Sequence, residues 1–227
     1  MWAVLPLKEF PNAKQRLSGV LDGRQRTDLL EAMASDVLQI LNGHPDLDGT
    51  LIVSNDPVAR RLARTYGADF VSEAELGAQG LNAVVQATVR QLARNGEDEV
   101  LIVHGDMPLI TAAEISLLIR HHRLAPAPAL TLATDRRSDG SNGLLCSASS
   151  AIAFAYGKGS CAQHQAQAQR AGLACSIMTL PGMSCDIDEP DDLLAFLNHP
   201  NVAAATRTRD YLAASGIARQ LLAQEHI

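Results

Sequence analysis

Short apolar segments alternate with segments of helical periodicity along most of this chain of 227 residues. The apolar segments predict strands over 3–5, 50–54, 69–71, 100–104, 129–133, 143–146 and 174–179. The helical patterns predict helices over 25–41, 57–66, 82–95, 111–122, 160–171 and 191–197, and a helical tail over 203–223. Strands that alternate with helices in this way favour an α/β fold, in which a mostly parallel central sheet is flanked by helices.

The composition narrows the class of ligand. A net charge of -6 and few aromatic residues (four Phe, three Tyr and one Trp) argue against a nucleic-acid-binding surface. The four cysteines form no Cys-x-x-Cys pair and have no zinc-like spacing. Neither a signal segment nor an apolar run of membrane-spanning length is recognised, so we expect reduced thiols and a cytoplasmic protein with no membrane partner.

A cationic loop follows the first predicted strand. The apolar run ends at Pro6, and Lys8, Lys14 and Arg16 come soon after it. Ligands of open α/β sheets bind at the carboxyl ends of strands, so the cluster predicts a phosphate-rich ligand. The loop lacks Gly-x-Gly-x-x-Gly spacing, and lysine and arginine side chains would therefore supply the phosphate contacts. The alternative is a solvated loop face.

Three aspartates are candidate metal ligands. Asp106 follows the apolar strand over 100–104, where a carboxylate suits magnesium; the alternative is a turn aspartate before a helix. Asp186 and Asp188 alternate along an extended segment, so both can face one cation, which would relieve their repulsion. The alternative for Asp188 is a helix N-cap.

Two further motifs are candidate ligand loops. Residues 79–82 form a glycine turn that begins a helix, where backbone groups can contact a nucleobase. A polar loop is also predicted over 135–142. The string over 139–143, together with a glycine-containing segment over 156–160, can bind a compact phosphate or carboxylate. His164 lies one turn into the next helix, either beside that ligand or on the helix surface. There is no Walker loop and no Gly-x-Ser-x-Gly nucleophile elbow.

Together these motifs resemble the 2-phospho-L-lactate guanylyltransferase family of coenzyme F-420 biosynthesis. The matching pieces, in order, are Pro6-Leu7-Lys8, Lys14-Gln15-Arg16-Leu17, Gly80-Leu81-Asn82, Asp106-Met107-Pro108, Ser141-Asn142, Tyr156-Gly157-Lys158-Gly159-Ser160, His164 and Asp186-Ile187-Asp188. Each piece is short and unspecific alone, whereas the ordered set is fairly specific. The family usually has Gly-Thr-Asn where this chain has Gly-Ser-Asn, which keeps the hydroxyl and loses a methyl group.

The resemblance implies a GT-A-like, Rossmann-like nucleotidyltransferase fold in one domain over 1–227. It implies a mainly nucleotide-binding half over 1–125, an acceptor-binding half over 126–200 and a C-terminal helical tail over 201–227. It also implies transfer of GMP from GTP, with Mg²⁺ as cofactor and release of pyrophosphate. The implied acceptor is a phosphorylated three-carbon acid: 2-phospho-L-lactate, phosphoenolpyruvate or 3-phosphoglycerate.

The resemblance also implies residue roles. Nucleotide contacts would come from Leu5, Pro6, Lys8, Lys14, Arg16, Ser54, Gly80, Leu81, Asn82 and Asp106. Of these, the residues expected to carry catalysis are Lys8, Lys14, Arg16 and Asp106. Magnesium would be held by Asp106, Asp186 and Asp188. The acceptor would contact Ser141, Asn142, Gly157, Gly159, Ser160 and His164.

Two rival hypotheses stay open at the level of sequence. One is another nucleotidyltransferase of the same fold, such as a molybdenum-cofactor type enzyme, although such families typically begin with a glycine-rich loop. The other is a non-catalytic GTP-binding regulatory protein. The expected partners are GTP, the phosphorylated acid, a downstream transferase that couples the product to a deazaflavin, and a second copy of the chain in a homodimer.

Overall fold

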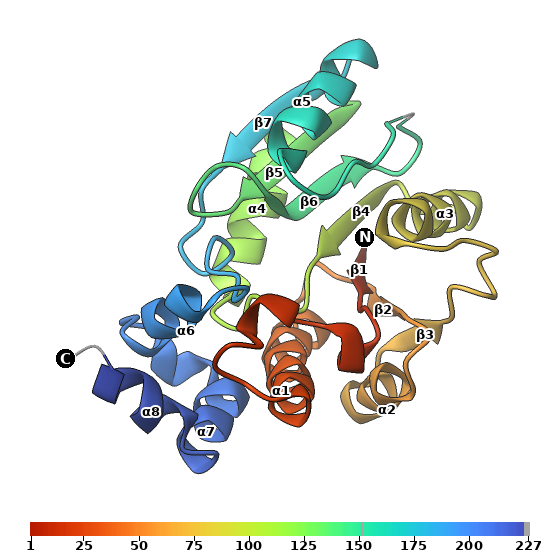
Figure 1. Cartoon of the computed structure of the whole chain (residues 1–227). Helices are drawn as coiled ribbons and strands as arrows, with labels where there is room; N and C mark the ends of the chain where they lie inside the picture. Colours follow the sequence, from red (N-terminus) through yellow and green to blue (C-terminus); the bar gives the residue numbers. More distant parts are fainter. Residues whose placement is uncertain (151, 225–227) are drawn as a thin grey trace.

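Residues 1–150 and 152–224 are described by the computed structural model, which is built around a seven-stranded sheet (Figure 1). The strands are β1 (Trp2–Pro6), β2 (Gly49–Val53), β3 (Asp69–Val71), β4 (Glu99–Val103), β5 (Ala129–Thr134), β6 (Ser141–Ser147) and β7 (Ala174–Met178). Their order across the sheet is β3-β2-β1-β4-β6-β5-β7. β1 pairs in parallel with both β2 and β4, and the predicted α/β fold with a mostly parallel sheet is confirmed.

Helices cover both faces of this sheet (Figure 1). The α-helices are α1 (Gly23–Asn42), α2 (Pro57–Tyr66), α3 (Leu81–Arg94), α4 (Ala112–Leu124), α5 (Ser160–Arg170), α6 (Pro190–Leu197), α7 (Thr206–Ala214) and α8 (Ile217–Gln224). Short 3-10 turns are η1 (Phe10–Asn12), η2 (Gln15–Leu17) and η3 (Val202–Ala204). Side chains cap the beginnings of α2 and α4: Asp56 accepts a 2.7 Å hydrogen bond from the Val58 amide, and Thr111 and Glu114 form a capping box.

The alternation of side chains along the central strands divides the core between two faces. Ala3 and Leu5 of β1 pack with buried side chains of α1, α4 and the C-terminal helices, whereas Val4 packs with α3 and α5 on the other face. All three are fully buried. A strand buried on both faces needs apolar side chains at successive positions, which explains the continuous apolar runs of the sequence.

One strand runs against the others and brings a second set of residues to the same edge. β6 is antiparallel to its neighbours β4 and β5. Val103 at the end of β4 therefore pairs with Gly143 near the beginning of β6. Because β5 and β7 are parallel, the chain after β7 also leaves the sheet at this edge. Strand ends from both halves of the sequence thus meet at one edge of the sheet.

The boundary of one predicted loop is wrong. The polar loop expected over 135–142 ends at Gly140, because Ser141 and Asn142 are buried and paired within β6. The tail over 203–223 is helical as predicted, and it consists of η3, α7 and α8, with Gly216 at a left-handed φ of 77° between the last two. The part of the predicted tail beyond Gln224 lies outside the described residues. Within the described residues, no helix combines the length and the hydropathy needed to cross a membrane.

Candidate active site

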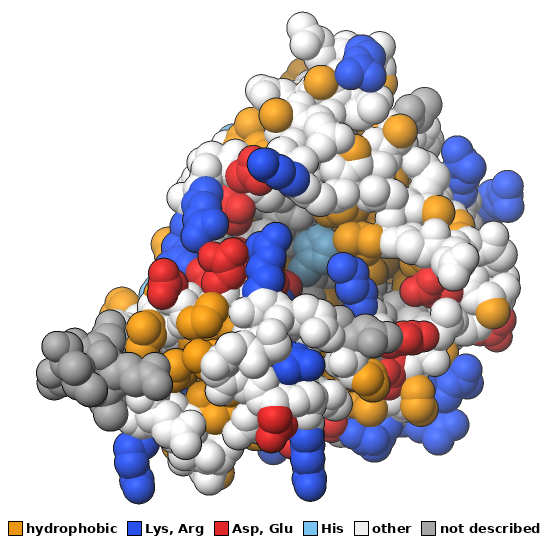
Figure 2. Space-filling model, viewed as in Figure 1, with side chains coloured by type: hydrophobic (Ala, Val, Ile, Leu, Met, Phe, Trp, Pro, Cys, Tyr) orange, Lys and Arg blue, Asp and Glu red, His pale blue; other side chains and the backbone are white. Residues whose placement is uncertain are grey.

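A cavity of about 400 Å³ opens at the carboxyl edge of the sheet, beside the ends of β1 and β4. Figure 2 shows that this face of the molecule is hollowed near its middle, with basic and acidic side chains around the hollow. The predicted site residues that line the cavity are Pro6, Lys8, Lys14, Arg16, Leu81, Asp106 and Asp188. The structure therefore brings the cationic loop and two of the three candidate metal ligands together.

Lys14 is the central contact of this cavity. Its Nζ atom lies 2.6 Å from Asp106 Oδ2 and 2.6 Å from Asp188 Oδ1. The Lys14 side chain is only 6% exposed, so the ammonium group depends on these two carboxylates for its hydrogen bonds. Burial lowers the pKa of Lys14, but the two carboxylates outweigh burial and the net shift is upward. Lys14 is therefore fully charged at neutral pH.

The backbone around Lys14 is held in an uncommon conformation. Lys14 has φ 52° and ψ 40°, the left-handed region that a residue with a Cβ atom rarely adopts. Earlier in the same loop, the Phe10 amide donates a 2.8 Å hydrogen bond to Asp56 Oδ2, which fixes the loop against the start of α2. This anchor and the two ion pairs of Lys14 hold the strained backbone in place.

Gly105 allows β4 to place Asp106 close to the loop after β1. A Cβ atom on Gly105 would lie 2.5 Å from Leu7 Cδ2, so a larger residue would require the Leu7 side chain to move. Burial raises the pKa of Asp106, but the charge and hydrogen bond of Lys14 lower it by more, and the net shift is downward. Asp106 is thus ionised wherever the protein is folded near neutral pH.

The three candidate metal ligands are near neighbours, but they do not surround an ion position unaided. Among the residues that the structure describes, no three His, Cys, Asp or Glu side chains are grouped as a metal site. Burial, followed by repulsion from Asp106, raises the pKa of Asp186 to about 6. Asp106 and Asp188 already direct their oxygens to one cation, the Lys14 ammonium. The donor set of carboxylate oxygens fits magnesium, provided that Lys14 gives up its position between them.

The two readings of Asp188 are separated by its hydrogen bonds. Glu189, not Asp188, is the N-cap residue of α6 and forms a capping box with Asp192. The Asp188 side chain instead contacts Lys14. The alternative that Asp188 caps the helix is therefore wrong, and its carboxylate belongs to the cavity.

A second cluster joins β6 to the beginning of α5. The Ser141 amide donates a 2.9 Å hydrogen bond to Ser160 Oγ, and Ser141 Oγ lies 3.0 Å from His164 Nδ1. The Gly159 amide donates to Asp139 Oδ2 at 3.0 Å. Segments 139–143 and 156–160, which the sequence placed at one ligand, are thus in direct contact.

His164 is fully buried, so the alternative that it lies on the helix surface is wrong. Its Nε2 atom accepts a 2.9 Å hydrogen bond from the Ala155 amide and therefore carries no proton. In the neutral ring the proton is then on Nδ1, which donates to Ser141 Oγ. Burial, with a smaller contribution from His104, lowers the pKa of His164 to about 4, consistent with a neutral ring.

Asn142 connects this cluster to the carboxylates. Its Nδ2 atom donates to Asp186 Oδ1 at 2.9 Å and to the Met183 carbonyl at 3.0 Å. Both amide hydrogens are therefore used within the protein. Asn142 fixes the position of Asp186 in this structure, and its contact with the acceptor stays a prediction.

The glycine turn before α3 lies next to the same region. Leu81 lines the cavity, and Gly80 has a left-handed φ of 81° as the N-cap residue of α3. Asn82 is exposed, and its side chain forms hydrogen bonds with the backbone of Tyr156. Gly157 and Gly159 also have positive φ values, 127° and 70°, within the segment that leads into α5.

Two predicted nucleotide contacts do not reach the cavity surface. Leu5 and Ser54 are both fully buried and are absent from the cavity lining. Ser54 Oγ accepts a 3.0 Å hydrogen bond from the Asp56 amide, so it supports the residue that anchors the loop at Phe10. The structure thus places Ser54 beneath the cationic loop.

Sequence reasoning missed two aromatic neighbours of the site. His104 lines the cavity, and the Tyr156 ring lies between His104 and His164, with centroid distances of 5.0 Å and 4.8 Å. Burial lowers the pKa of His104. His104 stands at the carboxyl end of an apolar strand directly before Gly105, a position that could have marked it as a site residue.

The fold is that of nucleotidyltransferases and GT-A-like glycosyltransferases. A protein from Desulfovibrio desulfuricans G20, provisionally named a nucleotide-diphospho-sugar transferase, superposes with a TM-score of 0.72 at 15% identity, covering 97% of each chain. A nucleotidyl transferase from Methanothermobacter has a TM-score of 0.59 at 15% identity, covering 86% of this chain and 94% of the other. Glucosyl-3-phosphoglycerate synthase from Mycobacterium tuberculosis, solved with Mn²⁺ and UDP, has a TM-score of 0.59 at 14% identity, covering 92% and 79%.

Sequence comparison identifies the family. The profile described as "Guanylyl transferase CofC like" matches residues 1–223, and the chain belongs to this guanylyltransferase family. A phosphoenolpyruvate guanylyltransferase from Conexibacter woesei is 37% identical over 85% of each chain. A 3-phospho-D-glycerate guanylyltransferase from Colwellia psychrerythraea is 33% identical over 87% of this chain and 92% of its own. The protein is therefore a nucleotidyltransferase, as the motif resemblance predicted, and neither rival hypothesis is supported.

Proposed function

We infer that this enzyme transfers GMP from GTP to the phosphate of a phosphorylated three-carbon acid and releases pyrophosphate, as a step of coenzyme F-420 biosynthesis. Family membership supports the guanylyl donor. The main support for the proposal is the pair of ion pairs that Lys14 forms with Asp106 and Asp188. They lie at the carboxyl edge of the sheet, in the cavity that Lys8 and Arg16 also line.

Charge neutralisation is the main task of such a site, because both reactants are anions. Lys8 and the exposed Arg16 would contact the triphosphate, and Lys14 would exchange one of its carboxylates for a phosphate oxygen. The attacking phosphate oxygen is already ionised near neutral pH, so no general base is required. The protein contributes by holding the two anions in line.

Asp106 and Asp188, with Asp186 beside them, would hold a magnesium ion. Such an ion supplies positive charge to the phosphate oxygens and orients them. Asn142 fixes the Asp186 carboxylate through a 2.9 Å hydrogen bond, which limits its rotation away from the other two. The Lys14 ammonium stabilises the same carboxylates in the structure described here.

The acceptor would bind beside Ser141 and the segment 157–160. With His164 donating to Ser141 Oγ, the hydroxyl hydrogen of Ser141 is left to donate to an acidic ligand. Relatives named for phosphoenolpyruvate and for 3-phospho-D-glycerate define the class, a three-carbon acid with a phosphate and a carboxylate. We place the enzyme in the cytoplasm, where its four free cysteines would stay reduced and a deazaflavin-coupling transferase would consume the product.

The test is an acceptor screen with an inactive variant. Wild-type enzyme is incubated with GTP, Mg²⁺ and each of the three phosphorylated acids, and products are identified by mass spectrometry and pyrophosphate release. Asp106→Asn should lower turnover by about 100-fold or more, because it removes a negative charge that would hold the magnesium ion and that pairs with Lys14. The matched control is Asp210→Asn, an exposed aspartate of α7 that pairs with the adjacent Arg209. Near-normal turnover by Asp106→Asn would contradict the proposal.

A further inference from the structure

The first turn of α3 is attached to the backbone of another segment by a single amide side chain. Asn82 Oδ1 accepts a 2.6 Å hydrogen bond from the Tyr156 amide, and Asn82 Nδ2 donates to the Tyr156 carbonyl at 3.3 Å. Both polar atoms of the side chain are therefore engaged with one backbone unit. Each of these polar atoms keeps one further hydrogen-bonding position, but the two bonds to Tyr156 fix the orientation of the amide, so turning it toward a nucleobase would break them.

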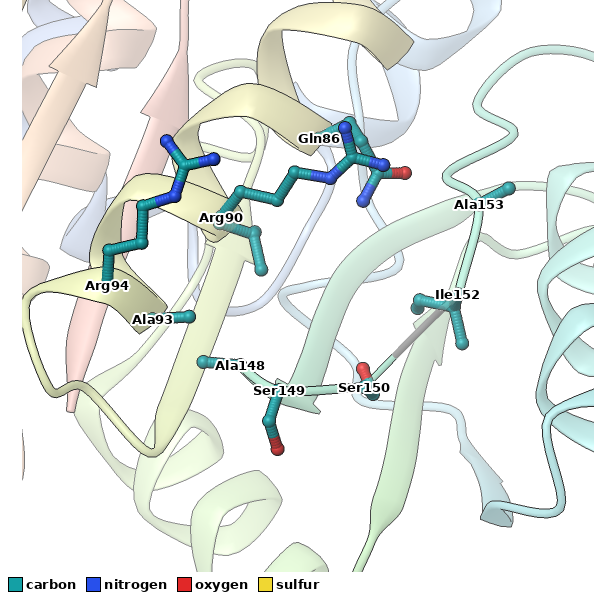
Figure 3. Close-up of a pocket in the computed structure, with 10 residues that line it drawn as sticks. Gln86, Arg90, Ala93, Arg94, Ala148, Ser149, Ser150, Ile152 and Ala153 are labelled. Carbon is teal, nitrogen blue, oxygen red and sulfur yellow. The ribbon is translucent and has the colours of Figure 1, made fainter.

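Beyond this contact the two segments separate quickly. One turn further along α3, Gln86 Oε1 accepts from the Phe154 amide at a longer distance, 3.4 Å. After Gln86, a cavity of about 410 Å³ lies between α3 and the chain after β6, with Arg90, Ser149 and Ile152 in its lining (Figure 3). The polar attachment of this segment to α3 thus rests on Asn82 and, more weakly, on Gln86, and Ile152 and Phe154 add apolar packing in the core shared with α3.

Tyr156 lies between the two halves of the site. The Tyr156 ring packs edge-on against His104, which lines the nucleotide cavity, and against His164, which bonds Ser141. Tyr156 Oη is buried and has no hydrogen-bond partner among the described residues, so the hydroxyl does not hold the residue in place. The position of Tyr156 therefore depends on its ring contacts and on the two hydrogen bonds from Asn82.

Tyr156 is also the first residue of a segment whose two glycines allow many backbone conformations. Gly157 and Gly159 follow it with positive φ values, and Ser160 starts α5. A chain with two glycines in three positions has many accessible conformations when its first residue is released. Fixing Tyr156 restricts the starting direction of this segment.

We propose that Asn82 is a positioning residue for the acceptor segment 157–160, and that it sets acceptor affinity rather than nucleotide choice. The identity of the acceptor segment rests on the proposed function. The two hydrogen bonds between Asn82 and the Tyr156 backbone, called the Tyr156 clamp below, do not depend on that function. In this proposal the turn before α3 positions the acceptor segment, whereas the motif predicted a contact with guanine.

The kinetic test compares Asn82→Ala with Asn95→Ala, an asparagine at the opposite end of α3 that does not contact the segment. Loss of two hydrogen bonds should raise KM for the acceptor by about tenfold in Asn82→Ala. KM for GTP and the preference for GTP over ATP should stay within about twofold, and Asn95→Ala should match wild type. A changed GTP preference with unchanged acceptor KM would overturn the proposal, as would no change in either constant.

A second measurement needs neither substrate. Amide hydrogen exchange of the ligand-free protein should be at least about tenfold faster for residues 156–159 in Asn82→Ala than in wild type, with α1 and β4 unchanged as internal controls. Asn82→Asp keeps the oxygen that accepts from the Tyr156 amide and should show a smaller increase. Unchanged exchange in Asn82→Ala would refute the Tyr156 clamp. Faster exchange in a protein with no guanylyl transfer would instead retain the Tyr156 clamp and reject the proposed function.

Discussion

At the scale of single residues, burial governs the protonation states around the cavity. His104 and His164 both have lowered pKa values because their rings are removed from water, and both are therefore neutral at pH 7. The positive charge that faces the carboxylates comes from Lys14 instead. This division keeps the hydrogen bond from His164 to Ser141 intact near neutral pH.

The lowered pKa of His164 predicts an acid-sensitive fold. In the unfolded chain its pKa is close to 6.5 and in the folded protein about 4, so the unfolded state binds more protons between these values. Stability is therefore lost as pH falls through this window. His164 alone should lower the free energy of unfolding by about 2 kcal/mol between pH 7.5 and pH 5. Urea denaturation at both pH values would measure the change.

The control for this prediction is His164→Gln, which has no titrating ring. The raised pKa of Asp186 acts in the opposite direction below pH 6, so the difference between variant and wild type isolates the histidine. An equal pH dependence in both proteins would show that His164 contributes nothing.

Residue identities at the site were predictable, whereas their contacts were not. Lys14, Asp106 and Asp188 each follow a recognisable strand end or extended segment. The two ion pairs, however, span 92 and 174 residues of sequence. Pairing over such separations is set by the strand order. The burial of Ser54 was missed for a similar reason, because a hydroxyl at a strand end can point to either side of the loop above it.

At the scale of elements, the C-terminal helices are tied to the core by one buried carboxylate. Asp36 of α1 is 5% exposed and accepts hydrogen bonds from the amides of Arg207 and Thr208, and from Thr208 Oγ1 at 2.7 Å. These amides belong to the first turn of α7, so Asp36 serves as a cap supplied by another helix. Figure 1 shows α7 beside α1 at the lower left.

Removing this cap should release α7. Asp36→Ala leaves buried amides of α7 without an acceptor and should lower the free energy of unfolding by about 3 kcal/mol. Limited proteolysis should cut within α7 sooner than in wild type. The control is Asp28→Ala, an exposed aspartate of α1 whose loss should cost about 0.5 kcal/mol or less. Wild-type stability of Asp36→Ala would contradict the assignment.

Elements with strong local signals were predicted accurately, including α2 and β3, whose observed bounds match the predicted ones. The beginning of β6 was not predicted accurately, because Ser141 and Asn142 are polar residues that are buried by partners distant in sequence. Polar residues of this kind suggest a loop until tertiary hydrogen bonds are known.

At the scale of the whole molecule, a cationic cavity is set in an acidic protein. The net charge is -6, yet Lys8, Lys14 and Arg16 line one cavity. The sequence predicted this contrast from composition and loop position alone. The carboxylates that pair with these cations could not be predicted, because their proximity depends on the order of the strands in the sheet.

The contrast predicts that GTP binding weakens with salt. Raising KCl from about 50 mM to about 500 mM should weaken GTP binding by about tenfold, since salt screens the exposed cations of the cavity. Lys8→Gln should bind more weakly at low salt and show a shallower salt dependence. Arg24→Gln, an exposed cation outside the cavity lining, should behave as wild type. Calorimetric titration measures both effects, and a salt-independent affinity would count against side-chain phosphate binding.

The reversed direction of β6 has a consequence for how such an enzyme can diversify. The cationic loop and Asp106 follow the carboxyl ends of β1 and β4, which pair with each other in parallel. Ser141 and Asn142 instead open a strand, and the chain just before them, 135–140, is a loop. Arg136 and Arg137 of that loop pair with Asp192 and Glu189 at the beginning of α6, directly after Asp188. A change of sequence or length in the loop would therefore reshape the acceptor side of the pocket and also shift the segment that carries a candidate magnesium ligand.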